Sequence, residues 1–301
     1  MLELTKESPR RPLAPIESRP IQLLKGEHEV EVIDFLSPYP LLTFVMTGWI
    51  KDNGLVSPLN RGNFYAYRNR RGELEGVALI GHITMFEANS SDAIAAFAGL
   101  TQNCPSAYAV LGEKQRVSRF MSCYTQEAPP PRLFCRELLF EQRSRQPLDG
   151  LVPSLRRATP EELDLVVPVH AQMFLEETGV NPLERDPSGF RQRCARRIQQ
   201  GRVWVCVEDG RLLFKADVIS DLAEVNYLEG VYVTPESRGK GFGSRCMRQL
   251  GNVLLTHTKS VCLLSKEEKS AAQACFLKAG YKLREYYETV YLQQDSDEAE
   301  N

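Results

Sequence analysis

The chain has 301 residues, of which 43% are hydrophobic and 25% are charged, a composition typical of a folded globular protein rather than a disordered one. The charges nearly balance, with 37 Lys and Arg against 39 Asp and Glu and a formal net charge of −2. No overall positive field therefore favours nucleic acid or a membrane surface as a partner. The length exceeds that of one average domain and is consistent with two.

The eight cysteines and four histidines do not form a metal-binding pattern. No two cysteines stand in a C-x-x-C pair, so we predict no metal site. Cys206 and Cys262 lie inside apolar runs, which is typical of core cysteines in a reduced protein. Cys275 is a candidate nucleophile, although a buried helix cysteine is the simpler interpretation. Residues 1–20 lack an apolar signal region and no run of about 18 apolar residues occurs, so we predict a cytoplasmic protein without a membrane span.

The N-terminal part of the sequence predicts a leader and a first domain. Residues 1–20 are polar and proline-rich and are predicted to be a flexible leader. The first domain is expected over residues 21–140. Inside it, residues 63–67 and 76–81 form two predicted strands around a turn at residues 69–72, which is typical of a hairpin.

Three further segments divide the chain. Three consecutive prolines at 129–131 predict a rigid loop between a helix and a strand. Residues 141–152 contain Arg143, Arg145, Pro147 and Gly150, are followed by Pro153, and are predicted to be a linker. A second domain is then expected over 153–292, followed by an acidic tail at 293–301.

The second domain alternates helices and strands. A helix is predicted to open at Thr159-Pro160, because Thr is a good N-cap and Pro fits the first helical position. The later elements are a helix over 187–200, strands over 203–207 and 212–218 around a turn at 208–210, a strand over 225–233, a helix over 243–257, a strand over 261–264, a helix over 270–278 and a final strand over 281–292. Met247, Leu250, Val253 and Leu254 form an apolar stripe that is predicted to face the core. This alternation predicts an α/β sandwich.

A glycine-rich loop follows the strand over 225–233. It contains three alternate glycines, Gly239, Gly241 and Gly243, and leads directly into a helix. Successive backbone amides there, without Cβ atoms in the way and at the positive end of a helix dipole, are suited to bind a phosphate or a diphosphate. Further phosphates are within reach of nearby cationic side chains: Arg238, Lys240, Arg245 and Arg248.

Three types of phosphate loop were compared with this segment. A Walker A loop requires Lys and then Ser or Thr after its last glycine, and a Rossmann fingerprint requires G-x-G-x-x-G; neither spacing is present. The pattern R-x-x-G-x-G after a V-x-V strand, with Arg238, Gly241 and Gly243 at its fixed positions, resembles motif A of the GNAT acyltransferases. The later motif A-x-x-x-Y-x-x-x-G-F of that family is matched in spacing by four residues: Ala272, Phe276, Gly280 and Tyr281.

The resemblance covers residues 153–292, and the whole chain is similar to two-domain bacterial members whose N-terminal half is a degenerate GNAT-like domain without the loop. It implies tandem GNAT-like folds, each a mixed, mostly antiparallel twisted sheet flanked by helices. It also implies acetyl-CoA as acetyl donor and an unidentified amine as acceptor, which attacks the thioester directly. The residues that the resemblance assigns to acetyl-CoA are Val231, Tyr232, Val233, Arg238, Gly239, Lys240, Gly241, Phe242, Gly243 and Ser244.

The sequence departs from the family pattern at two positions. Phe276 replaces the tyrosine that often serves as general acid, and Lys269 replaces an asparagine seven positions earlier. The acid is then another tyrosine (Tyr227, Tyr232 or Tyr281), or solvent protonates the departing thiolate. The alternative function is a non-catalytic acyl-CoA-binding or regulatory protein.

Three acidic residues are candidates for contacts with the acceptor. Glu229 lies on the predicted cofactor strand, and strand alternation predicts the same face for Glu229 and Val231. We predict that Glu229 is the catalytic base, with a solvated strand glutamate as the alternative. Glu176 and Glu177 end a predicted helix and are candidate substrate-binding residues, with a solvated helix end as the alternative. The sequence leaves open whether Lys215 and Asp217 pair, and it predicts neither the acceptor's identity nor the oligomeric state.

Overall fold

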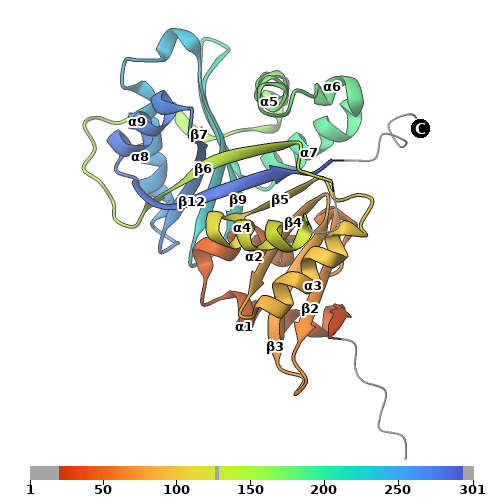
Figure 1. Cartoon of the computed structure of the whole chain (residues 1–301). Helices are drawn as coiled ribbons and strands as arrows, with labels where there is room; N and C mark the ends of the chain where they lie inside the picture. Colours follow the sequence, from red (N-terminus) through yellow and green to blue (C-terminus); the bar gives the residue numbers. More distant parts are fainter. Residues whose placement is uncertain (1–19, 126–128, 294–301) are drawn as a thin grey trace, which may run out of the picture.

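The computed structural model describes residues 20–125 and 129–293. The predicted leader, except Pro20, and the predicted tail, except Gln293, lie outside the described residues. The described residues form one twelve-stranded sheet in the order β1-β2-β3-β4-β5-β12-β6-β11-β10-β9-β8-β7. Most neighbouring strands are antiparallel, and only β4–β5 and β10–β11 are parallel pairs. Figure 1 shows the sheet with helices on both faces, which confirms the predicted fold class.

The first half contributes six strands and four α-helices. They are β1 (Ile21–Leu23), η1 (Gly26–His28), α1 (Glu29–Leu36), α2 (Pro40–Asn53), η2 (Pro58–Asn60), β2 (Gly62–Arg68), β3 (Leu74–Gly81), β4 (Ile83–Ala88), α3 (Ser91–Gln102), β5 (Ala109–Glu113), α4 (Lys114–Tyr124) and β6 (Leu133–Gln142).

The second half contributes the other six strands. Its elements are β7 (Leu155–Arg157), η3 (Pro160–Glu162), α5 (Leu163–Thr178), α6 (Pro182–Arg185), α7 (Pro187–Gln199), β8 (Val203–Glu208), β9 (Arg211–Asp221), β10 (Asn226–Val233), η4 (Pro235–Ser237), α8 (Phe242–Leu254), β11 (Val261–Lys266), α9 (Ser270–Ala279) and β12 (Lys282–Tyr291). No helix among the described residues has both the length and the apolar character that a membrane crossing requires.

The predicted elements agree with these bounds to within a few residues. The hairpin strands and the helices over 187–200, 243–257 and 270–278 are confirmed, and the three prolines at 129–131 lie between α4 and β6. Two details differ. Thr159 caps a short 3-10 turn before α5 rather than α5 itself. Val253 is 38% exposed while its neighbour Leu254 is 2% exposed, so Val253 lies at the border of the apolar stripe and not in the core.

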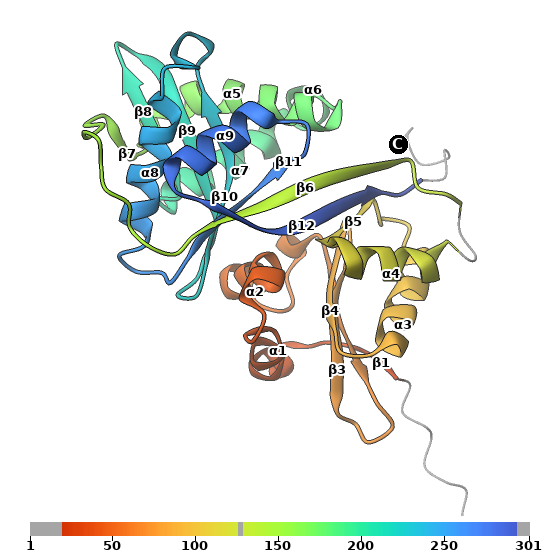
Figure 2. The ribbon, with the colours of Figure 1, turned by 60° about the vertical axis from the view of Figure 1, so that its left-hand side comes forward.

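The two halves exchange their last strands. β6, from the first half, pairs with β11 of the second half, and β12, the last strand of the chain, pairs with β5 of the first half. β6 and β12 also pair with each other and form the long central ribbon between the halves in Figure 2. The sheet is therefore continuous between the halves. The first two residues of the segment predicted as a linker end β6, and residues 143–152 lie outside the strands. The predicted domain limits stay a prediction.

Each face of the sheet carries helices from both halves. In the first half, α3 and α4 pack on one face of the sheet through Phe97 and Phe120. In the second half, α8 packs on this same face through Met247 and Leu250. On the other face, α1 and α2 cover β2 and β3, while α5 and α7 cover β8. We call this second face the α2 face.

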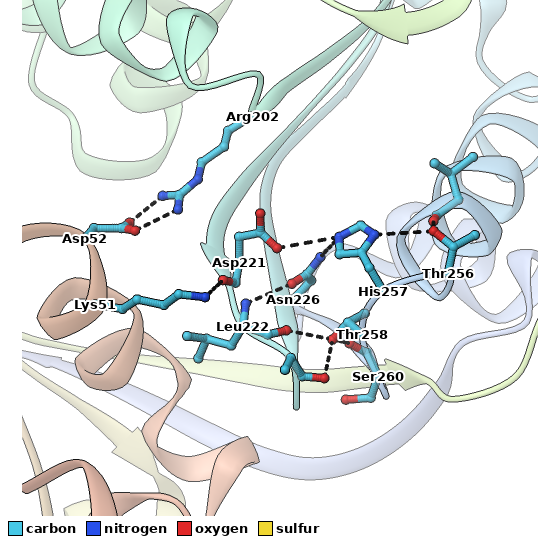
Figure 3. Close-up of polar contacts among 12 residues, drawn as sticks. Lys51, Asp52, Arg202, Asp221, Leu222, Asn226, Thr256, His257, Thr258 and Ser260 are labelled. Carbon is cyan, nitrogen blue, oxygen red and sulfur yellow. Dashed lines mark hydrogen bonds and ion pairs between the residues drawn. The ribbon is translucent and has the colours of Figure 1, made fainter. Parts of the chain in front are cut away.

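Helix α2 also reaches across to the second half. Figure 3 shows Asp52 at the end of α2 paired with Arg202, which lies just before β8, through both guanidinium nitrogens. Lys51 Nζ donates to the Asp221 carbonyl at 3.0 Å. Ser220 Oγ donates to the Phe44 carbonyl at 2.8 Å in a buried position. These contacts fix α2 over β9 and β10.

Gly48 permits this close contact between α2 and β9, and we expect Gly48→Ala to destabilise the protein. A Cβ at residue 48 would lie 2.3 Å from Ser220 Oγ, so the helix must move away from the sheet. The expected loss is about 1–3 kcal/mol of unfolding free energy, although Ala is the better helix former by about 1 kcal/mol. Urea unfolding measures the change. Adding Ser220→Gly should recover part of it, and equal losses in the single and double variants would contradict this explanation.

Candidate functional site

The glycine-rich loop connects β10 to α8 and leaves several backbone amides without an acceptor. Gly239 and Gly241 both have positive φ, 72° and 73°, and Gly241 is the N-cap of α8. The Gly241 carbonyl accepts bonds from the Arg245 amide and from Ser244 Oγ, so it is turned into the helix. A Cβ at Gly239 would meet no atom within 4 Å, so this part of the loop borders open space.

Six consecutive backbone amides of this loop lack an acceptor. The Arg238 amide still donates to the Pro235 carbonyl, and the Arg245 amide donates to Gly241. Between them, the N–H groups of residues 239–244 donate to no acceptor in the described part of the chain. Because buried or partly buried amides are normally paired, and because the first amides of a helix carry its positive end, this segment is suited to an anion. It fits the diphosphate that the sequence predicts there.

Beside the loop, two strands of the sheet separate. β10 and β11 pair only from Asn226–Val261 to Leu228–Leu263, while β11 continues to Lys266 along β6. The edge of β10 from Glu229 to Val233 therefore has no strand partner on its β11 side within the described residues. We call this place the β10–β11 split. Its free backbone groups could bond to an amide-containing chain, as the predicted pantetheine contacts of residues 231–233 require.

A β-bulge alters the side-chain pattern at the split. The register of β10 on β9 shifts between Glu229 and Tyr232, and Gly230 has φ of 61°. The extra residue places Val231 beside Leu228 in the core under α8. The predicted common face for Glu229 and Val231 is therefore wrong, because strand alternation is broken between them. Glu229 is instead on the α2 face, near Tyr227 and Arg197.

The cationic side chains near the loop differ in whether they are free to contact a phosphate. Arg238 Nε donates to the Val233 carbonyl at 2.8 Å, and Arg245 Nη1 lies 3.5 Å from the Lys240 carbonyl; the Arg238 and Lys240 side chains are exposed. The prediction that Arg248 contacts phosphate is wrong, because its guanidinium binds Asp149 at 2.6 Å and the Lys278 carbonyl at 2.6 Å.

One cation near the loop was missed from the sequence. Lys278 Nζ lies 3.7 Å from the position of a Cβ at Gly241, so the end of α9 brings a positive charge to the loop. Its place is set by the packing of α9 on α8, and no local motif marks it. Lys278 therefore joins Arg238, Lys240 and Arg245 as a candidate phosphate contact.

Glu229 lies at the β10–β11 split with its side chain reached by solvent, although protein surrounds the carboxylate on most sides. This loss of hydration raises the pKa of Glu229, and Glu177 and Asp217 add to the rise, while Arg197 offsets part of it. Glu229 forms no salt bridge with any described residue. A carboxylate with a raised pKa and an open side is a stronger base than an ordinary glutamate, as proton acceptance from a substrate requires.

Lys215 and Asp217 pair beneath the bulge. Lys215 Nζ lies 2.8 Å from Asp217 Oδ2, and both side chains are at most 1% exposed. Arg197 approaches the same oxygen at 3.0 Å. Burial opposes ionisation of Asp217, but Lys215, Arg197 and His170 together outweigh it and lower its pKa. Lys215 also donates to the Gly230 carbonyl at 3.3 Å, so the pair supports the bulge that exposes Glu229.

His170 lies 3.4 Å from Asp217 Oδ2 on α5. Burial lowers the pKa of His170 to about 3, and the neighbouring Lys215 contributes. The imidazole is therefore neutral at neutral pH. A neutral imidazole beside Asp217 is consistent with a structural role for His170.

The two candidate substrate glutamates end α5 but differ in surroundings. Glu176 Oε1 accepts a bond from Gln172 on the same helix at 3.0 Å. The backbone carbonyl of Glu177 accepts one from Lys266 Nζ at 3.3 Å, which joins the end of α5 to the end of β11. Burial raises the pKa of Glu177, while Lys266 and Lys269 lower it in part. Glu177 is therefore the one of the two that lies near the split.

Phe276, an apolar residue, occupies the position at which the family pattern has the tyrosine that often serves as general acid. Phe276 is 5% exposed and packs in the core under α8 and α9, against Phe140 and Tyr281. Of the three tyrosines considered as substitutes, Tyr281 is 1% exposed and its hydroxyl lies near Gly251. Tyr232 has the Arg238 guanidinium over its ring. Tyr227 lies beside Glu229, and burial raises its pKa well above the ordinary value, with a contribution from Glu229.

The cysteines of the described residues are all free thiols. Burial raises the pKa of Cys275 to about 11, so its thiol stays protonated at neutral pH, as expected for the structural interpretation. Among the described residues no group of three or more His, Cys, Asp and Glu side chains is arranged to bind a metal ion. A cavity of about 290 Å³ opens elsewhere, beside η2 and β2, and none of the predicted site residues lines it.

Comparison with known proteins relates this geometry to a family. Residues 199–283 match the family model described as an acetyltransferase (GNAT) domain, and a search of curated protein sequences finds no match. A GNAT-family acetyltransferase from Colwellia psychrerythraea has a TM-score of 0.58 at 11% identity, over 91% of this chain and 99% of that chain.

Two further solved structures share the fold over nearly the whole chain. A Drosophila protein has a TM-score of 0.62 at 13% identity, over 93% of this chain and 100% of that one. A tandem GNAT protein from the clavulanic acid biosynthesis pathway has a TM-score of 0.57 at 13% identity, over 92% of this chain and 99% of that one. The family match at residues 199–283 and the fold shared along nearly the whole chain lead to one conclusion: this segment of the second half matches the acetyltransferase (GNAT) domain, and the chain has a tandem GNAT-like fold.

Proposed function

We propose that this protein is an acetyl-CoA-dependent N-acetyltransferase that transfers an acetyl group to an amine by direct attack. The observation that carries the proposal is the coincidence of two features at one end of β10. The unpaired amides of residues 239–244 are suited to a diphosphate, and the β10–β11 split begins directly beside them. Acetyl-CoA is a molecule that requires both, because its diphosphate and its amide-containing pantetheine arm are continuous.

In this proposal the loop and β10 bind the donor. The amides of Gly239 to Ser244 donate to the diphosphate, and the exposed cations Arg238 and Lys240 offset its charge. The free backbone edge at residues 231–233 bonds to the pantetheine arm. These contacts direct the thioester along β10 toward Glu229.

Glu229 is proposed as the catalytic base. It accepts a proton from the acceptor ammonium, directly or through water, so that the neutral amine attacks the thioester carbonyl. The C–N bond forms, the C–S bond breaks and the thiolate departs. The second proton that the nitrogen loses balances the proton that the thiolate receives. Tyr227 lies beside Glu229, and its raised pKa keeps the phenol protonated and able to donate to a thiolate. The predicted cytoplasmic location stays a prediction.

Release of CoA thiol distinguishes this function from the alternative, a non-catalytic acyl-CoA-binding protein, which the apolar Phe276 favours. The full chain is incubated with acetyl-CoA and a broad amine panel, and binding of acetyl-CoA is followed by thermal shift, where about 2.7 kcal/mol of stabilisation is expected at a hundredfold excess over Kd. Binding with thiol release supports the enzyme. Binding without release from any amine supports the alternative, and no binding contradicts both.

A further inference from the structure

Three arginines from separate elements gather where the first half meets α6 and α7 of the second half. Arg61 directly follows η2, Arg185 ends α6 and Arg193 lies on α7. We call these three residues the arginine cluster. Loss of hydration lowers the pKa of Arg61, and the charges of Arg193 and Arg185 lower it further. The three guanidinium groups are therefore close enough for their charges to repel one another.

Hydrogen bonds between the halves fix this arrangement. Arg196 Nη2 on α7 donates to Asn53 Oδ1 at the end of α2 at 3.2 Å, and Asn53 Nδ2 donates to Asn60 Oδ1 at 3.0 Å. Arg61 directly follows Asn60 in the chain. Arg193 precedes Arg196 by three residues, so both lie on the same side of α7. These contacts place Arg61 beside the side of α7 that carries Arg193.

The positive charge of the cluster is only partly balanced. In the part of the chain that the structure describes, neither Arg61 nor Arg185 forms a salt bridge. Two acidic residues flank Arg185 in the sequence. Asp186 binds Arg193 at 3.0 Å, and Glu184 Oε1 accepts a bond from Asn181 at 2.7 Å instead of pairing with Arg185. The cluster is therefore suited to an added anion.

Helix α7 connects the cluster to the proposed acceptor site. Arg197 lies about one turn after Arg193 and binds Asp217 Oδ2 at 3.0 Å. It is also close enough to Glu229 for the two charges to interact. Burial lowers the pKa of His170, which lies beside the same Asp217, and Arg193 contributes to this shift. An acceptor whose amine lies at Glu229 can therefore extend along α7 to the arginine cluster.

A row of aromatic rings borders the cluster on the side of the first half. His82 stacks on Tyr108 with ring centroids 5.0 Å apart, and Tyr108 meets Tyr291 edge-on at 5.4 Å. Burial lowers the pKa of His82 to about 4, with contributions from two arginines of the cluster. Burial raises the pKa of Tyr291 to about 12, and Glu177 at the end of α5 contributes. The row therefore runs from the cluster to the end of α5, the second side on which the cluster adjoins the acceptor site.

We propose that the acceptor is an amine that also carries an anionic group, a carboxylate or a phosphate, and that Arg61 of the first half binds this group together with Arg185 and Arg193. Arginine suits both anions, because its planar guanidinium donates two parallel hydrogen bonds to either of them. The inference rests on the proposed function, since it takes the reacting amine to lie at Glu229. It makes Arg61 a specificity-determining residue and gives the first half a part in selecting the acceptor.

The test compares amines that differ in the presence of an anionic end. The probes are ω-amino carboxylates and aminoalkyl phosphates with about two to eight methylene groups, each with the n-alkylamine of equal length. Calorimetry on the full chain with CoA present measures binding, and CoA thiol release is measured in parallel with acetyl-CoA. We expect the Kd of the best anionic amine to be about tenfold or more below that of its alkylamine. Added NaCl at about 0.5 M should reduce this difference, because salt screens the attraction.

Substitutions of Arg61 test its part in this preference. Arg61→Gln should remove most of the difference by raising the Kd of the anionic amine about tenfold. Arg61→Lys keeps the charge and should restore part of the difference. Arg70→Gln is the matched control, because Arg70 is also an exposed arginine but lies beyond the other end of β2. It removes the same charge and should leave the preference intact.

The outcomes separate this inference from the proposed function. Equal Kd values for anionic amines and alkylamines in the unmodified protein overturn the inference, and so does a preference that survives Arg61→Gln. Preferential binding of an anionic amine that depends on Arg61 but yields no thiol supports the anion site and contradicts the proposed function. Thiol release from alkylamines without any preference for anionic amines supports the proposed function and overturns the inference.

Discussion

Glu229→Gln is expected to lower kcat by about 100-fold while acetyl-CoA affinity stays the same. The amide cannot accept a proton, yet it has nearly the same size and leaves the bulge at Gly230 and its Lys215 contact intact. A loss of about 100-fold corresponds to about 2.7 kcal/mol in the barrier. Steady-state kinetics with a saturating amine measures kcat, and a direct titration measures the acetyl-CoA affinity.

The pH dependence of kcat tests which protonation state of Glu229 is active. The pKa of Glu229 is raised above the ordinary 4.5, so the base is protonated and inactive at pH values below that raised pKa. In the unmodified protein kcat should therefore fall about tenfold per pH unit on the acid side, and this limb should vanish in Glu229→Gln. Glu224→Gln is the control, because Glu224 pairs with Lys259 at 2.8 Å outside the site. Unchanged turnover in Glu229→Gln would remove Glu229 from the mechanism.

Gly241→Ala is expected to weaken acetyl-CoA binding by about 10- to 100-fold. Gly241 has φ of 73°, a conformation that costs a residue with a Cβ about 1–2 kcal/mol. The nearest atom to an added Cβ is Arg245 Nη1 at 3.6 Å, so backbone strain rather than collision is the cause. Relief of that strain rotates the N-cap of α8 and turns the adjacent amides away from the diphosphate. Calorimetric titration with acetyl-CoA measures the loss.

Gly72→Ala is a matched control for this loop substitution. Gly72 has φ of 81° with no atom within 4 Å of an added Cβ, and it lies in the turn between β2 and β3. Both variants should lose a similar amount of stability, about 1–2 kcal/mol, but only Gly241→Ala should lose acetyl-CoA affinity. Full affinity in Gly241→Ala would mean that the loop does not bind the diphosphate.

The sequence predicted those parts of the site that depend on local geometry. Alternate glycines before an amphipathic helix determine the loop and the unpaired amides of residues 239–244, and the periodicity of residues 225–233 determines the strand that leads into it. The same local logic identified the hairpins and the core stripe of α8. Such features depend on few neighbouring residues, so a single sequence is sufficient for them.

The features of the site that the sequence did not predict depend on contacts between segments that are distant in the chain. The exchange of β6 and β12 places Glu137 of β6 beside Lys266 of β11 and close enough to Glu229 for their charges to interact, and no pattern in the sequence around Glu137 indicates these neighbours. The packing of α9 on α8 places Lys278 at the loop. Arg248 binds Asp149, which is distant from it in the sequence. The bulge at Gly230 reverses the predicted face of Val231, because one glycine in a strand sequence fits both a regular strand and a bulge.

Hydrogen exchange of the loop amides tests the central claim most directly. Residues 239–244 have no backbone acceptor within the described chain, so their amides should exchange quickly in the free protein. Saturating acetyl-CoA should slow the exchange of the peptide that covers them, while the peptide around Gly72 stays unchanged. Binding of acetyl-CoA that leaves the exchange of residues 239–244 unaffected would contradict the assignment of this loop to the diphosphate.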